Sequence, residues 1–220
     1  MPVSRRDFIV GAGAAVGTAG VAGPGAAAAA AATRVGVAPE AREAIGVIGT
    51  ILQDGPLLTG FGWLTHVAGL SNADLFTDPA QRGAPTARLR WHAEVRVSTI
   101  DLLPALFFGT GTGRLRIFYA DHGGADNAQP DSFATGRLVA RYIGLFRNIQ
   151  TVIAPDHAVT EIIGELAQRT AQRFAVRGHH HQLGRVGTPQ RLLASGPATR
   201  TEPTIPRSTR YVAGGISFPR

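Results

Sequence analysis

Two histidines and a glutamate have the types and spacing for acid–base or metal chemistry. His92 and Glu94 are two residues apart in a segment that alternates apolar and polar residues, so on a strand their side chains point the same way. His66 lies in an earlier segment of similar character. If the two strands pair, all three side chains share one surface, where they could hold a metal ion or act as an acid–base pair. The simpler interpretation is an outward polar face shared with Arg90 and Arg96.

Two further groups of side chains are of types that metal ions bind. In the triplet of consecutive histidines the middle ring of an extended segment points away from its neighbours, so only His179 and His181 could share an ion. A polar loop carries the carboxylates of Asp121, Asp126 and Asp131, which are calcium-type ligands, but their spacing does not fit an EF-hand. A solvated turn and an ordinary hairpin loop explain both groups. We therefore expect no resident metal and no cofactor.

The chain lacks the short motifs of common enzymes. It contains no Gly-x-Ser-x-Gly and no His-Glu-x-x-His. It has no cysteine, which excludes disulfides, iron–sulfur clusters and thiolate zinc sites. The run Gly109-x-Gly111-x-Gly113 does not match the dinucleotide-binding pattern, because a strand-like segment follows it, and we expect a flexible hairpin turn there. No catalytic residue can be assigned from motifs.

The elements that would position these residues are strands. Residues 88–97 alternate between apolar and polar side chains, which predicts a strand with one buried and one solvated face. Residues 159–176 fit either a helix or two strands, and Gly164 with its threonine neighbours favours the strands. Pro104 breaks a short edge piece at 102–108. The other expected strands are 43–53, 58–70, 114–119, 132–143, 146–153 and 210–218.

Eight to ten strands without a strand–helix–strand rhythm predict an all-β fold. A single antiparallel sheet of that size curls or closes, because closure removes exposed edges. We predict a closed or nearly closed antiparallel barrel, with a two-sheet sandwich as the alternative. An eight-stranded barrel can leave room for one small ligand. The aromatic residues expected to line such a cavity are Phe61, Trp63, Trp91 and Tyr119.

In size and in the spacing of its expected strands, the region from residue 43 to residue 220 resembles secreted bacterial β-barrels of the allene oxide cyclase and dirigent type, and lipocalins. The resemblance rests on no sequence motif. It therefore implies a fold and carries over no active-site residue.

The N-terminus resembles a twin-arginine export signal. That family has the pattern Ser/Thr-Arg-Arg-x-Phe-Leu-Lys, and Ser4, Arg5, Arg6 and Phe8 match it, with Ile9 in the place of Leu. A short, glycine-diluted apolar stretch and an alanine run with Ala-x-Ala cleavage sites follow. The resemblance implies the twin-arginine translocase and signal peptidase as partners, and a periplasmic or extracellular location. The stretch is too short for a bilayer anchor, so we expect no membrane span after cleavage.

These signals divide the chain of 220 residues into three parts. We expect a signal peptide with its helix at 1–32, cleaved between Ala28 and Thr33, a flexible tail at 33–42, and one barrel domain at 43–220. All 22 basic residues are arginines, and the formal net charge is +7. The arginines are dispersed and accompany no nucleic-acid-binding motif, so we expect no nucleic-acid partner.

Three functions fit this sequence. The first is an exported soluble barrel that binds a small apolar ligand or an envelope component. The second is an enzyme, most plausibly a cofactor-free isomerase or cyclase, and the third is a purely structural secreted domain. A cavity would separate the third from the others. Convergent polar groups inside it would favour an enzyme, and a wholly apolar lining would favour a binding protein.

Overall fold

The computed structural model describes residues 31–37, 43–199 and 208–217. The predicted signal helix, with Ser4, Arg5, Arg6, Phe8 and Ile9, lies outside them. No helix among the described residues is long and apolar enough to cross a membrane.

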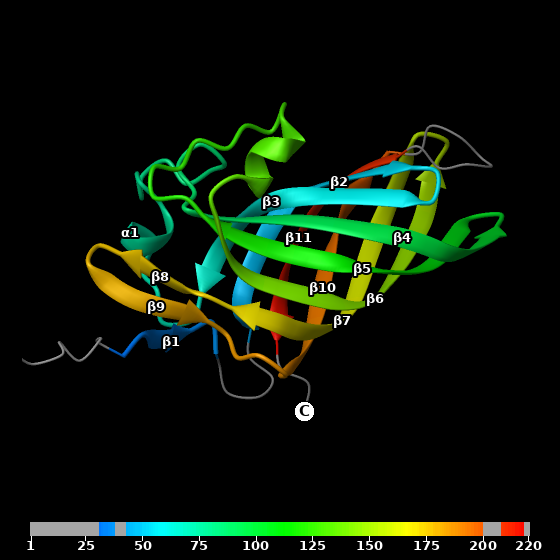
Figure 1. Ribbon diagram of the computed structural model, residues 1–220. Coiled ribbons are helices and arrows are strands. Elements are labelled where there is room, and N and C mark those ends of the chain that lie inside the picture. The colour runs from blue at the N-terminus through cyan, green and yellow to red at the C-terminus, as the bar shows by residue number, and fades with distance from the viewer. Residues whose placement is uncertain (1–30, 38–42, 200–207, 218–220) are drawn as a thin grey trace, which may run out of the picture. The chain divides into compact units, whose positions relative to one another are not determined.

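Eight antiparallel strands close into a barrel (Figure 1). Each strand pairs with the next along the chain, and β11 closes the ring by pairing with β2. The prediction of an all-β fold with a closed antiparallel barrel is confirmed, and the sandwich alternative is wrong. The barrel strands are β2 (Glu43–Asp54), β3 (Leu57–Val67), β4 (Leu89–Leu103), β5 (Leu106–Tyr119), β6 (Arg137–Ala154), β7 (His157–Ala171), β10 (Pro189–Ala198) and β11 (Ser208–Ser217).

A small second sheet lies outside the ring, and two of its three strands come between β7 and β10 in the sequence. It consists of β8 (Arg173–Val176), β9 (His179–Leu183) and β1 (Thr33–Val35). Figure 1 shows it at one end of the barrel. Its strand β1 pairs in parallel with β9, from Thr33 opposite His181 to Val35 opposite Leu183.

Two short helical segments lie in the longer connections. One is α1 (Asn72–Leu75), where the Ser71 hydroxyl and the Asp74 carboxylate form a capping box. A 3-10 turn, η1 (Pro130–Ala134), lies in the connection between β5 and β6. Residues 159–176 form strands rather than a helix, as favoured above, in β7 and β8.

The strand boundaries near glycines differ from those expected. Gly109–Gly113 is not a turn but part of β5, and the hairpin turn lies at Pro104 and Ala105. A side chain at Gly111 would place its Cβ 2.5 Å from the carbonyl oxygen of Arg96, so the glycine lets β4 and β5 approach closely. Likewise β6 runs unbroken through Gly144, where two strands were expected.

The barrel interior is packed solidly at the end next to the small sheet. The side chains there are at most 1 % exposed and come from six different strands: Ile45, Leu64, Leu89, Ile117, Tyr142 and Ile216. At the other end the inward-facing residues are slightly more exposed, for example Ala93 at 7 % and Ile162 at 8 %. One end of the barrel is thus a filled core, and the other is hollow.

Candidate functional site

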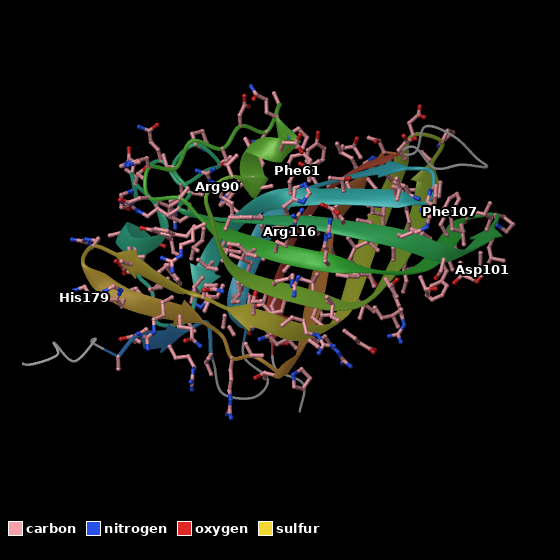
Figure 2. The ribbon with its side chains drawn as sticks, viewed as in Figure 1. Phe61, Arg90, Asp101, Phe107, Arg116 and His179 are labelled. Carbon is pink, nitrogen blue, oxygen red and sulfur yellow. The ribbon has the colours of Figure 1, made fainter. Side chains whose placement is uncertain are left out.

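The hollow end of the barrel contains a cavity to which all eight barrel strands contribute. Figure 2 shows Phe107 and Asp101 at this end of the molecule and His179 at the opposite end. The volume open to the centres of water molecules is about 80 Å³, enough for several waters or a slender ligand. One lining residue from each strand, taken from β2 to β11 along the chain, gives Val47, Leu58, Trp91, Leu115, Phe146, Ile162, Leu192 and Val212.

Trp91 lies at the inner end of the cavity, against glycines. A Cβ added at Gly49 would lie 2.5 Å from the indole ring, and one added at Gly60 or Gly62 would lie 2.8 Å from it. Any residue larger than glycine at these positions would therefore clash with the Trp91 side chain. The indole Nε1 donates a hydrogen bond to the carbonyl oxygen of Ile48 at 3.1 Å. The indole is therefore fixed in orientation, with an apolar face available to the cavity.

The other end of the cavity is polar. Arg210 of β11 is 2 % exposed, and its Nη2 donates hydrogen bonds to Oε1 of Gln53 and, at 3.3 Å, to Oε1 of Gln150. Nearby, the hydroxyl of Thr160 donates to Oδ1 of Asn148 at 2.6 Å. Except for Thr160, all of these residues line the cavity.

The guanidinium of Arg210 is incompletely satisfied. Its Nε and Nη1 are buried and have no hydrogen-bond partner among the described residues. Burial lowers the pKa of Arg210 well below its ordinary value, to about 10, because the charged form loses its hydration. Arg210 is still a cation at neutral pH. A buried arginine with free donors is unusual, because arginines are rarely fully buried unless they are paired.

In the described part of the chain, the cavity lining offers positive charge but no acid or base that titrates near neutral pH. The charged residues among those described along it are Arg147 and Arg210. Arg147 pairs through Nη1 with Oε1 of Glu165 at 2.7 Å. Among the described residues, the lining contains no histidine, aspartate, glutamate, cysteine or tyrosine. The arrangement can orient and neutralise an anion, but it lacks a group suited to move a proton.

The chain matches no family model, no curated protein and no solved structure. What this cavity can bind is therefore inferred from its own lining.

Of the four aromatic residues expected in the cavity, Trp91 alone lines it. Phe61 and Trp63 face outward, because they pair with His92 and Arg90 across β3 and β4, while Gly60 and Gly62 take the inward positions beside Trp91. A small outer core covers them: the Phe61 ring lies 5.2 Å from that of Phe133 in η1 (Figure 2), and Ala84 and Ala125 complete the cluster.

Tyr119 belongs to the packed end of the barrel. Its ring lies 5.2 Å from that of Phe174 in β8, and its hydroxyl donates to Oδ1 of Asp121 at 2.8 Å. Burial and the neighbouring Asp121 raise the pKa of Tyr119 to about 12. It is a structural residue that joins the barrel to the small sheet.

His92 and Glu94 meet on the outer face of β4, outside the cavity. His92 Nδ1 lies 3.1 Å from Nη2 of Arg116 and 3.8 Å from Oε1 of Glu94, and Glu94 also pairs with Arg114. Burial, then the charge of Arg116, lowers the pKa of His92, so the imidazole is neutral at pH 7 and its Nδ1 accepts from the guanidinium.

The expected grouping of His66 with this pair does not form. The register places Phe61 opposite His92, five residues before His66, and the His66 side chain is exposed. A bulge between Gly46 and Val47 in β2 shifts the pairing near His66. The remaining pair is a surface ion network with one buried histidine, which matches the polar outward face favoured from the sequence.

Among the described residues, the candidate metal ligands do not gather into a group of three. His179 is exposed on β9, and the ring of His181 lies 5.8 Å from that of Phe174. Asp121 pairs with Arg88 at 2.6 Å, Asp126 accepts from the backbone of its own loop, and Asp131 lies in the first turn of η1. Within the described part of the chain, no three histidine, aspartate or glutamate side chains gather as a metal site would require.

The residues that sequence reasoning missed are Arg210, Gln53 and Gln150. A signal was present for two of them: Arg210 is in phase with the inward Val212 and Ile216, and Gln53 is in phase with Val47 and Ile51. A polar residue at an inward strand position is the pattern to look for.

Proposed function

We propose that this protein is an exported barrel that binds a small, largely apolar ligand inside its hollow end. Export would use the twin-arginine translocase and signal peptidase, on the basis of the motif from Ser4 to Ile9. The ligand would enter next to the β4–β5 hairpin, where the lining residue Ile100 is 40 % exposed.

The observation that carries this proposal is the unfilled space between Trp91 and Arg210. Protein interiors normally pack to crystal-like density, and a void costs stability. Here Gly109 of β5 faces the space, and a Cβ at this position would meet no atom closer than 3.6 Å, so a larger residue could occupy part of the volume. A purely structural barrel would gain stability from filling this volume, so the retained space favours a binding role over a structural one.

Convergent polar groups in the cavity were expected to favour an enzyme, and such groups are present. They are an arginine and three amides, from Gln53, Asn148 and Gln150. None of these transfers a proton readily at neutral pH, and the His92–Glu94 pair lies on the other side of the barrel wall. Binding, rather than acid–base catalysis, is what this set of groups performs.

Fluorescence can test the proposal, because the chain has two tryptophans and one of them, Trp91, lines the cavity. In a Trp63→Phe variant, a neutral apolar probe such as N-phenyl-1-naphthylamine should change the Trp91 emission saturably. A Trp91→Phe variant should lose this signal. Native mass spectrometry of protein purified from an exporting host should also reveal a small bound molecule. Absence of both saturation and a bound molecule would refute the proposal.

A further inference from the structure

We propose that the ligand carries a carboxylate and that Arg210 is its receptor. This inference rests on the proposed function and names the chemical class of the ligand: a monocarboxylic acid with an unbranched or flat apolar body. The argument uses the charge, the free donors and the shape of the cavity.

The first step is the unbalanced charge. Arg210 is 2 % exposed, and none of the ion pairs in the described part of the chain involves it. Its two partners, Gln53 and Gln150, supply amide oxygens, which accept hydrogen bonds but bring no negative charge. A buried cation is tolerated best when an anion is beside it.

The second step is the free hydrogen-bonding capacity. Both glutamines bond to Nη2, which leaves Nε and Nη1 without an acceptor. Water could satisfy these donors but would not neutralise the charge. A carboxylate does both, and hydrogen bonds between ionised groups are stronger than neutral ones.

The third step is a comparison with Arg90, which is also 2 % exposed. Arg90 donates from Nε to the carbonyl oxygen of Ala87, from Nη1 to Ser132 O and Thr135 Oγ1, each at 3.0 Å, and from Nη2 to Gly123 O. The protein therefore satisfies all three nitrogens of one buried arginine from its own backbone and loops. At Arg210 it leaves two nitrogens open, and this arginine is the one that lines the cavity.

The fourth step is the shape of the cavity. From Arg210 the lining continues through apolar residues to Trp91, and charged or amide groups do not recur at the Trp91 end, which Val47, Leu115 and Val212 surround. An acid bound with its head group at Arg210 would place its apolar body along these residues and against the indole. The same body without the acid group would leave the arginine unpaired.

The test is calorimetric titration of the wild-type protein at pH 7 with decanoate and with two neutral compounds of the same chain length, 1-decanol and methyl decanoate, all below their aggregation concentrations. We expect decanoate to bind at least about tenfold more tightly than either neutral compound, the scale of one charge-assisted interaction. Octanoate and dodecanoate define the length that the cavity accepts.

Two variants locate the preference. Arg210→Gln should bring decanoate and decanol to similar affinity. Arg191→Gln, which removes the same charge from the exposed outer face of β10, should keep the wild-type preference. If decanol binds wild-type protein as tightly as decanoate, or if Arg210→Gln keeps the preference, the inference is wrong although the proposed function stands. If no compound of the series binds, the proposed function itself fails. If Arg210→Gln does not fold, the comparison of decanoate with decanol on the wild-type protein still tests the preference for a carboxylate.

Discussion

Arg210 and Gln150 are joined across the barrel interior: Nη2 of the arginine donates to Oε1 of the glutamine at 3.3 Å, although β11 and β6 are not neighbours in the sheet. Gln53 of β2 accepts from the same nitrogen. Residues far apart in the sequence therefore build one polar site, while the rest of the interior is mainly apolar. This arrangement gives the cavity two chemically different ends.

The two equally buried arginines should differ sharply in their contribution to stability. Arg90→Met removes hydrogen bonds to three carbonyl oxygens and one hydroxyl in the loops around β4 and leaves these groups unpaired. We expect the free energy of unfolding to fall by about 3 kcal/mol or more, which lowers the Tm by roughly 6–12 °C.

Arg210→Met should change the stability of ligand-free protein by less than about 1 kcal/mol at pH 7. Burial lowers the pKa of Arg210 to about 10, so the charge costs the folded state roughly 3 kcal/mol, and this offsets the lost bonds to the glutamines. Because the folded pKa is the lower one, the cost is fully present well below pH 10 and decreases as the pH rises above 10. Differential scanning calorimetry of both variants checks the contrast. Equal losses in the two would show that Arg210 is an ordinary structural residue.

Filling the cavity should block binding without harming the fold. A Cβ at Gly109 would meet its nearest atoms at 3.6 and 3.7 Å, which is ordinary contact, so the backbone there has room for a side chain that points into the cavity. We expect Gly109→Val to show at least about tenfold weaker probe binding and an unchanged or higher Tm, since valine also favours strands. Gly111→Val is the matched contrast, because its Cβ would lie 2.5 Å from Arg96 O, and it should destabilise the barrel. Undiminished binding by Gly109→Val would place the ligand elsewhere.

The burial of His92 predicts acid sensitivity. Burial, and then Arg116, lowers the pKa of His92 below 6.5, while Glu94 opposes the shift. The unfolded chain takes up this proton near pH 6.5 and the folded chain resists it, so stability falls as the pH drops through 6.5 toward the lower folded value. An NMR titration of His92 should give a midpoint below 6.5, and His92→Gln should lose less Tm than wild type between pH 7 and 5. A midpoint above 6.5 would show that Glu94 dominates the environment.

The export proposal predicts a strict requirement for arginine at two positions. Replacing both Arg5 and Arg6 with lysine keeps the charge but removes the twin-arginine motif. We expect export to fall to background in a host with this pathway, and the uncleaved chain to stay in the cytoplasm. Immunoblots of cell fractions measure this. A lysine pair that exports as well as wild type would point to another route.

Sequence alternation gave the clearest strand prediction at residues 88–97, most of which lie in β4, whereas residues 159–176 of β7 and β8 fitted either a helix or two strands. It failed in β3, where the inward positions are Gly60 and Gly62 and the large Phe61 and Trp63 face outward. A glycine carries no hydrophobic signal, and its inward position follows only from the bulk of Trp91 on the neighbouring strand. The outward aromatic residues are in turn buried by Phe133, which comes from a distant loop.

The candidate site was harder to predict than the fold because it depends on which strands face one another across the barrel. Gln53, Gln150 and Arg210 lie on three strands that are far apart in the chain and meet only after the ring has closed. Proximity in the chain suggested instead the group of His92 and Glu94, which does form but on the outer surface. Strand register, rather than residue type, separates these two outcomes.

A crystal structure of the protein grown with decanoate tests the central claim most directly. The account predicts elongated electron density inside the barrel, with a carboxylate within hydrogen-bonding distance of Nη1 or Nε of Arg210 and a chain that extends toward Trp91. A cavity that contains only ordered water, or side chains that have collapsed to fill it, at decanoate concentrations well above any measured Kd would contradict it.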